Sequence, residues 1–208
     1  MNFQAGDMIR FGWETFKKRP WFLIGVLVVA AAASFAVSYL TELFGRGGFG
    51  YFVGFVISVA AQTLIAMGVT AFLLKAHDSI LSISFSELLH PNPFWNYLAE
   101  TIIFGLAVML GFVLLIIPGI LVYLAYQFGD YIVIDRHLGP IEALKESARI
   151  TRGYRWELLW LFLMIIGLNI LGALALLVGL LVTIPVSWLA IVRAYRTLEH
   201  RASEVATV

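Results

Sequence analysis

Apolar residues run in long stretches along this chain, and short segments between them carry most of the charged residues. A transmembrane helix needs about 20 consecutive apolar residues, because the hydrocarbon core of a bilayer is about 30 Å thick. Six stretches meet or approach that length: residues 21–44, 49–74, 94–117, 119–134, 156–181 and 185–198. The pattern predicts an all-α, polytopic membrane protein with six transmembrane helices.

The breaks between these stretches contain turn-forming residues and predict three helical hairpins. Residues 45–48 (Gly-Arg-Gly-Gly) separate the first pair, Pro118-Gly119 the second, and residues 183–185 (Thr-Ile-Pro) the third. Proline suits the first position of a helix and disfavours helix in the preceding residue. A kink at Pro118 inside one long helix is the alternative. Residues 94–134 are too many for one span, so we favour a hairpin.

A short amphipathic segment precedes each predicted hairpin, at residues 7–16, 84–89 and 139–150. A tryptophan then marks the start of each hairpin, as expected of residues at the membrane–water interface: Trp21, Trp95 and Trp156. The regularity suggests a loose threefold internal repeat. The alternative is that any six-helix protein with loops on one side of the membrane shows this punctuation.

The basic residues predict the orientation. Of the 14 Lys and Arg residues, all but Arg46 fall on one side of the predicted membrane when six spans are assumed and Arg193, in the half of the sixth span nearer that side, is counted with it. Cytoplasmic loops carry an excess of Lys and Arg. We therefore expect a multi-pass protein of the cytoplasmic membrane with both termini in the cytoplasm. Residues 1–20 would form a cytoplasmic N-terminus, residues 21–200 a six-helix bundle and residues 201–208 a tail.

Composition supports the membrane assignment and narrows the chemistry. Hydrophobic residues make up 61% of the chain and charged residues 13%, with a mean hydropathy of +0.92. Soluble domains have roughly 45–50% apolar and about 25% charged residues. A net charge of +1 predicts no nucleic-acid partner, and the absence of cysteine excludes thiolate chemistry. No metal-binding helix, nucleophile elbow or P-loop occurs, so we expect no metal, no cofactor and no enzymatic activity.

Residues 114–171 carry a resemblance to a known family. They contain Ile117-Pro118-Gly119, then residues 131–135 (Tyr-Ile-Val-Ile-Asp), the 139–147 segment and Thr151-Arg152-Gly153. This arrangement resembles a broad bacterial and archaeal family of uncharacterised membrane proteins, which includes the glycerophosphoryl diester phosphodiesterase membrane domain. The resemblance implies a six-helix membrane domain. It does not imply phosphodiesterase activity, which in those proteins belongs to a separate soluble domain.

Ionisable residues inside a membrane are functional candidates, because burying a charge in lipid is costly. Asp130 and Arg193 lie within the fourth and sixth predicted spans, and we predict that they pair. Such a pair would fix helix packing, or take part in coupling or substrate binding. We expect Gln62 and Asn169, in the middle of their spans, to make interhelical hydrogen bonds.

Two further groups are predicted at the membrane surface. Glu100 and Glu157 follow the boundary tryptophans, where a carboxylate near a helix N-terminus is favoured by the helix dipole. Four basic residues lie on the third amphipathic segment or directly after it: Lys145, Arg149, Arg152 and Arg155. They reflect ordinary membrane topology, or they form a docking surface for lipid headgroups or a cytoplasmic partner.

We favour a non-enzymatic membrane module that organises or binds membrane lipids or a partner protein, with a homo-oligomer as a further option. A small transporter or exporter that uses the Asp130–Arg193 pair is the alternative. An intramembrane lipid-processing enzyme using Glu100, Asp130 or Glu157 as acid or base is the third reading, and it would need a cleft that exposes these carboxylates.

Overall fold

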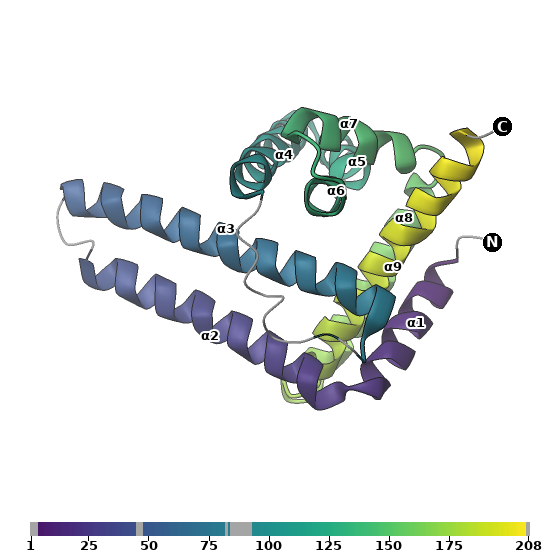
Figure 1. Cartoon of the computed structure of the whole chain (residues 1–208), viewed down its shortest axis with the longest axis horizontal. Helices are drawn as coiled ribbons and strands as arrows, with labels where there is room; N and C mark the ends of the chain where they lie inside the picture. Colours follow the sequence, from purple (N-terminus) through teal and green to yellow (C-terminus); the bar gives the residue numbers. More distant parts are fainter. Residues whose placement is uncertain (1–3, 45–47, 82, 84–92, 207–208) are drawn as a thin grey trace.

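The structure is a computed structural model that describes residues 4–44, 48–81, 83 and 93–206. The described residues form helices joined by short turns, with no strand among them. In chain order, and as drawn in Figure 1, the helices are α1 (Ala5–Lys18), α2 (Pro20–Phe44), α3 (Gly48–Ser79), α4 (Phe94–Leu114), α5 (Ile116–Tyr126), α6 (Gly129–Arg136), α7 (Pro140–Ile150), α8 (Arg155–Leu174) and α9 (Leu180–Ala206).

Six of the resulting segments are long and apolar enough to cross a membrane, which confirms the predicted number. They are α2, α3, α4, the stretch from Ile116 to Arg136 that contains α5 and α6, α8 and α9. Consecutive spans form the hairpins α2–α3, α4–α5 and α8–α9. The structure is therefore all-helical and indicates a multi-pass membrane protein.

Large apolar side chains are exposed toward the far ends of the hairpins. Phe49 in α3 is 82% exposed, Leu114 at the end of α4 is 74% exposed, and Leu176 in the α8–α9 turn is 87% exposed. The α2–α3 hairpin projects away from the remaining helices in Figure 1. A water-soluble monomer rarely exposes contiguous apolar surface on this scale, so these ends have the character of lipid-facing surface.

The buried core lies where the hairpins converge. Its largest fully buried side chains include Phe72 of α3, Phe128 before α6 and Tyr195 of α9. The amphipathic helix α1 packs along α9, where a Cβ on Gly12 would overlap the backbone of Val186. Glycine at position 12 thus permits the close approach of the two helices.

Two of the three predicted amphipathic segments correspond to α1 and α7, whereas residues 84–89 lie outside the described residues. Each of the three boundary tryptophans is the second residue of a long helix and is strongly exposed: Trp21 in α2 (84%), Trp95 in α4 (77%) and Trp156 in α8 (80%). The tryptophans therefore lie at the starts of three spans, as predicted.

Two predicted turns were misplaced. The α4–α5 hairpin turns at Leu115, which is extended (φ −168°, ψ 157°), and Pro118 lies in the first turn of α5, where its missing N–H costs no helix bond. The turn after α8 covers residues 175–179, and Pro185 lies inside α9. A membrane helix tolerates such a proline, so proline was a poor marker of both turns.

The fourth span is a broken helix, although the sequence predicted a continuous one. It is interrupted at Gln127 and Phe128, between α5 and α6. The side chain of Ser147 in α7 satisfies backbone groups at this break. Its hydroxyl donates to the carbonyl oxygen of Ala125 at 2.9 Å and accepts from the N–H of Phe128 at 3.2 Å. Helix α7 therefore stabilises the interruption.

Candidate functional site

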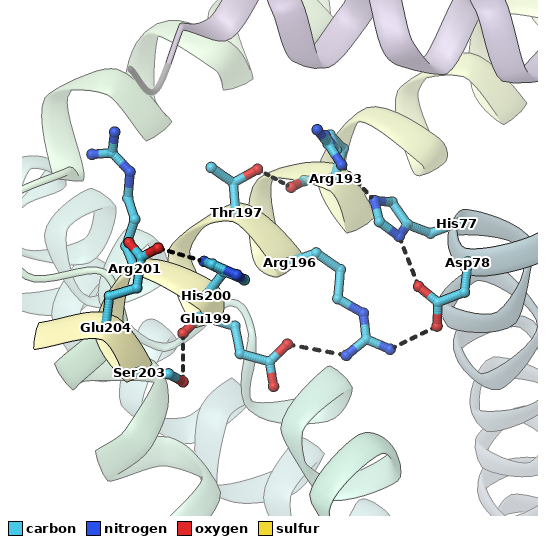
Figure 2. A pocket seen from close by; sticks show the side chains of 10 residues that line it. All are labelled: His77, Asp78, Arg193, Arg196, Thr197, Glu199, His200, Arg201, Ser203 and Glu204. Carbon is cyan, nitrogen blue, oxygen red and sulfur yellow. Dashed lines mark hydrogen bonds and ion pairs between the residues drawn. The ribbon is translucent and has the colours of Figure 1, made fainter. Parts of the chain in front are cut away.

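Charged residues gather at the end of the molecule where α3, α6, α7 and α9 meet. Arg196 of α9 is central: one terminal nitrogen donates to Asp135 at 2.7 Å and to Glu199 at 3.0 Å, and the other donates to Asp78 at 3.2 Å. Figure 2 shows Arg196 between Asp78 and Glu199. A groove of about 1080 Å³ runs past these side chains. Arg196 links three helices by charge.

The network continues through α7. Arg136 bonds Glu199 at 3.0 Å and Glu146 at 2.8 Å, and Glu146 also accepts from Arg149 at 2.7 Å. The hydrogen bond from Arg149, and the positive charges of Arg149 and Arg136, lower the pKa of Glu146. The same contact raises the pKa of Arg149. Because each carboxylate in this network has an arginine partner, the network's role is to hold the helices together.

The predicted Asp130–Arg193 pair is not formed. A terminal nitrogen of Arg193 lies 3.3 Å from Nε2 of His77, as Figure 2 shows. The guanidinium of Arg193 also lies over the ring of Phe11, 4.9 Å from its centroid. Asp130 instead accepts the backbone N–H of Tyr131 at 2.8 Å. The two side chains point to different neighbours.

The rotation of α9 explains why the pair fails. Val186, Ala190 and Arg193 follow the i, i+4, i+7 spacing of one helix face, and Val186 meets Gly12 of α1 on that face. A different face, through Ile191 and Tyr195, reaches α6. Arg193 is therefore directed at α1, and spacing along the chain could not reveal this.

A polar pocket of about 260 Å³ lies between α4 and the broken α5–α6 span. Two stripes of side chains form most of its wall, each with the i, i+3, i+4, i+7 spacing of one helix face. From α4 come Tyr97, Glu100, Thr101 and Phe104, and from the broken span come Tyr123, Tyr126, Gln127 and Asp130. We call this the carboxylate pocket.

Glu100 is not the interfacial carboxylate that we predicted. It is the seventh residue of α4, about 9 Å along the helix from its start at 1.5 Å per residue, and is only 1% exposed. Its carboxyl group lies against Gly129, where any Cβ would overlap Oε1 of Glu100. Oε1 has no hydrogen-bond partner among the described residues. The glycine allows this burial, and only the tertiary structure shows it.

A second cavity, of about 560 Å³, opens between α5 and the start of α8. Its apolar wall is one face of α5, again with i, i+3, i+4, i+7 spacing: Ile117, Ile120, Leu121 and Leu124. Its polar rim consists of Arg152, Gly153 and Arg155, beside Trp156 and Leu159. We call this the arginine-rimmed pocket.

The turn between α7 and α8 holds the two rim arginines in place. Thr151 is fully buried, and its hydroxyl lies 2.8 Å from the carbonyl oxygen of Ser147 and 3.2 Å from that of Ala125, which places the turn against α5. Gly153 adopts the left-handed conformation (φ 89°), in which a residue with a side chain would be strained. Nε of Arg155 is buried and has no hydrogen-bond partner among the described residues. The turn thus presents two arginines beside an apolar wall.

The predicted basic segment divides into two parts. Arg149 is engaged with Glu146, and Lys145 is exposed on α7 outside the arginine-rimmed pocket. Only Arg152 and Arg155 line the pocket, and none of the ion pairs among the described residues includes either of them.

The other predicted polar residues have structural placements. Gln62 of α3 donates to the carbonyl oxygen of Ser34 in α2 at 3.3 Å. Asn169 of α8 donates to the hydroxyl of Ser187 in α9 at 3.1 Å. Each therefore joins the two helices of one hairpin. Glu157 lies in the first turn of α8, as expected of a carboxylate near a helix N-terminus.

Within the described parts of the chain, no three His, Cys, Asp or Glu side chains are grouped so that they could hold a metal ion. Sequence reasoning missed the tyrosines of the carboxylate pocket and the partners of Arg196. The repeated i, i+3, i+4, i+7 spacing was a visible signal for the pocket. No comparable signal marks the Arg196 network, whose members come from distant segments.

Comparison with known families gives one match. Residues 102–202 match the family described as Protein of unknown function (DUF975), which is just under half of the chain. The matched region runs from α4 to α9 and includes the arginine-rimmed pocket and most of the carboxylate pocket. Comparisons with curated proteins and with solved structures gave no match. The similarity is thus to an uncharacterised family, and no comparison supports a link to the glycerophosphoryl diester phosphodiesterase membrane domain.

Proposed function

We propose that this protein is a non-enzymatic membrane module that binds anionic lipids, with the arginine-rimmed pocket as the site of the lipid headgroup. The observation that carries the proposal is the combination of an apolar wall on α5 with Arg152 and Arg155 at the rim. An anionic phospholipid has the matching chemistry, because its acyl chain is apolar and its phosphate accepts hydrogen bonds from arginine.

Three properties of the site suit a lipid. The pocket volume of about 560 Å³ lies within the usual range of ligand sites. Trp156 beside it is 80% exposed, as suits a side chain at headgroup depth. The wall residues Ile117 and Leu121 are themselves exposed, at 72% and 42%, so the pocket continues onto the apolar surface of the hairpin.

The backbone adds to the attraction for an anion. Helix α8 begins without a side-chain capping hydrogen bond at its N-cap. The first N–H groups of a helix carry a partial positive charge and bind phosphate readily. The rim therefore combines two guanidinium groups with a helix N-terminus.

The proposal includes the orientation inferred from the basic residues. With both termini in the cytoplasm, the α7–α8 turn faces the inner leaflet, whose anionic lipids attract basic segments by about 1 kcal/mol per near-surface charge. The alternative of transport through an Asp130–Arg193 pair loses its basis, since Arg193 contacts His77 and Phe11 instead.

Lipid retention in mixed nanodiscs tests the proposal. The protein is reconstituted with equal amounts of phosphatidylglycerol and phosphatidylcholine, released, and analysed by native mass spectrometry. The wild type should retain phosphatidylglycerol preferentially. The double variant Arg152→Gln/Arg155→Gln should lose that preference roughly tenfold or more, from two charges at about 1 kcal/mol each.

The matched control is Arg10→Gln/Lys145→Gln, which removes the same charge from two exposed positions outside the pocket. The control should keep the preference. An equal loss of the phosphatidylglycerol preference in both double variants would show that the preference depends only on total charge, and would contradict a specific site. The same spectra report subunit number and any retained protein, which tests the predicted homo-oligomer or partner.

A further inference from the structure

The carboxylate pocket is separate from the arginine-rimmed pocket, and the two share no lining residue. Two acidic side chains, Glu100 and Asp130, line the same cavity. None of the ion pairs among the described residues includes either carboxyl group. The pocket therefore brings together two acidic groups that have no basic partner among the described residues.

Burial makes this arrangement unusual. Glu100 is 1% exposed, and its Oε1 atom has no hydrogen-bond partner among the described residues. A buried carboxylate without a partner is costly, and a second one nearby raises that cost. The cost falls when a cation enters the pocket. A ligand with a positive charge and N–H or polarised C–H groups would thus complete the site.

The walls indicate what kind of cation fits. Five aromatic residues line the pocket: Tyr97, Phe104, Tyr123, Tyr126 and Tyr131. The rings of Phe104 and Tyr123 are 5.9 Å apart, so they form adjoining parts of the wall. Aromatic faces attract ammonium groups, and cages of aromatic rings with a carboxylate recognise organic ammonium ions. A divalent metal ion such as Ca²⁺ would instead favour a site with roughly six or more oxygen ligands and fewer aromatic side chains.

The helix break beside the pocket gives the site further polar character. Asp130 is the second residue of α6, directly after the interruption at Gln127 and Phe128. Broken membrane helices commonly bind ions or substrates, because their interruption frees backbone dipoles at that depth. Here Ser147 stabilises the break from α7, so the interrupted backbone is a fixed part of the structure.

We propose that the carboxylate pocket binds a small organic ammonium ion, with Glu100 and Asp130 neutralising its charge and the tyrosines enclosing it. The volume of about 260 Å³ is below the usual range for drug-sized ligands, so the ligand is a small amine or quaternary ammonium group. This site is a second binding function, independent of anionic lipid.

Calorimetric titration of the purified full chain with tetramethylammonium chloride, and separately with ethylammonium chloride, tests the proposal. The protein is kept in detergent with a constant excess of sodium chloride. The wild type should bind at least one of the two saturably. Glu100→Gln and Asp130→Asn should each weaken binding by roughly tenfold or more, the loss expected for one charged partner of a buried ion.

Two controls separate the site from general effects. Glu157→Gln removes a carboxylate from the first turn of α8, outside the pocket, and should leave binding unchanged. Tyr126→Leu keeps both carboxylates but removes an aromatic wall, and should weaken binding by a few-fold. Every variant is first checked for an unchanged elution profile and melting temperature. If one carboxylate variant does not fold, the other decides.

Three results would overturn the proposal: no saturable binding to the wild type with either probe, undiminished binding in the folded carboxylate variants, or displacement by potassium chloride at equal concentration. Repeating the titration in nanodiscs with and without phosphatidylethanolamine distinguishes the sources of the ligand. Competition would identify a lipid headgroup amine, and its absence a free ammonium ion. Unchanged binding in Arg152→Gln/Arg155→Gln would separate this site from the lipid site, whereas loss there would contradict their independence.

Discussion

Two groups of carboxylates in this protein differ in whether they have basic partners. Asp135, Glu146 and Glu199 lie where α6, α7 and α9 meet, and each bonds at least one arginine. Glu100 and Asp130 lie between α4 and the broken span, and none of the ion pairs among the described residues includes them. Each member of the first group has an arginine partner, and neither member of the second has one among the described residues.

The difference separates structure from function. A balanced network gains its stability from internal partners and needs no ligand. A buried carboxyl group without a partner, such as that of Glu100, is costly when ionised unless a cation binds, and ionisable groups of this kind in membranes are typical of functional sites. The contrast therefore assigns the Arg196 network to folding and the carboxylate pocket to binding.

Arg196→Gln should have the largest effect on stability. It leaves Asp135, whose side chain is only 18% exposed, without an arginine partner, while Glu199 keeps its bond to Arg136. Removing one member of a buried ion pair costs about 3 kcal/mol, because the other charge stays buried. Thermal unfolding in detergent should show a clearly lowered melting temperature. A melting temperature equal to that of the wild type would contradict the claim that the Arg196 network stabilises the fold.

Glu146→Gln should have an intermediate effect, and the effect should depend on pH. Arg149 and Arg136 hold the pKa of Glu146 below its ordinary value, so its stabilising contribution is complete above the ordinary pKa of about 4.3. That contribution is lost as the pH falls through the lowered pKa. At pH 7 the variant should be less stable by about 1.5 kcal/mol, the value of hydrogen bonds to a charged group.

Melting curves of the wild type and Glu146→Gln, measured from pH 7 downward, test whether the stabilising effect of Glu146 decreases as the pH falls. The two melting temperatures should converge at acid pH. A constant difference down to pH 3 would mean that the charge of Glu146 contributes nothing and that packing alone explains the loss.

Glu100→Gln should change stability little and in the opposite direction. It removes a buried carboxyl group that lacks an ion-pair partner in the described structure, so the variant should be as stable as the wild type or more stable by up to about 1 kcal/mol. Thermal unfolding without added amine measures this. Destabilisation as large as that of Arg196→Gln would show that Glu100 has a structural partner. It would contradict the claimed difference between the two groups of carboxylates.

Arg10→Gln should have the smallest effect. Arg10 bonds Glu14 at 3.0 Å on the outer face of α1, but the two side chains are 76% and 52% exposed. Exposed pairs of this kind contribute about 0.5 kcal/mol or less. The variant serves as the control for loss of a basic residue, and its melting temperature should match that of the wild type.

The spans and their boundaries were largely predictable from the sequence, because hydropathy and length act locally. The tryptophans at the starts of α2, α4 and α8 were found for the same reason. Turn positions were less predictable. The turn after α8 uses left-handed Leu176 and Leu177 together with a close contact between Gly172 and Gly179, whereas Pro185 is accommodated within the helix.

The candidate sites were only partly predictable. Asp130, Arg152 and Arg155 were identified because charge is rare in or near apolar segments. The predicted pairing of Arg193 with Asp130 was wrong, because the rotation of α9 depends on the contact between Gly12 and Val186. The burial of Glu100 depends on Gly129, a residue 29 positions later in the chain, and no local pattern encodes such a contact.

The most direct test of the lipid-binding account is an experimental structure of the full chain in nanodiscs that contain phosphatidylglycerol. The account predicts a lipid in the arginine-rimmed pocket, with its phosphate within hydrogen-bonding distance of Arg152 and Arg155 and an acyl chain along α5. A well-resolved map in which the pocket holds no lipid, while headgroups are ordered elsewhere on the protein, would contradict it.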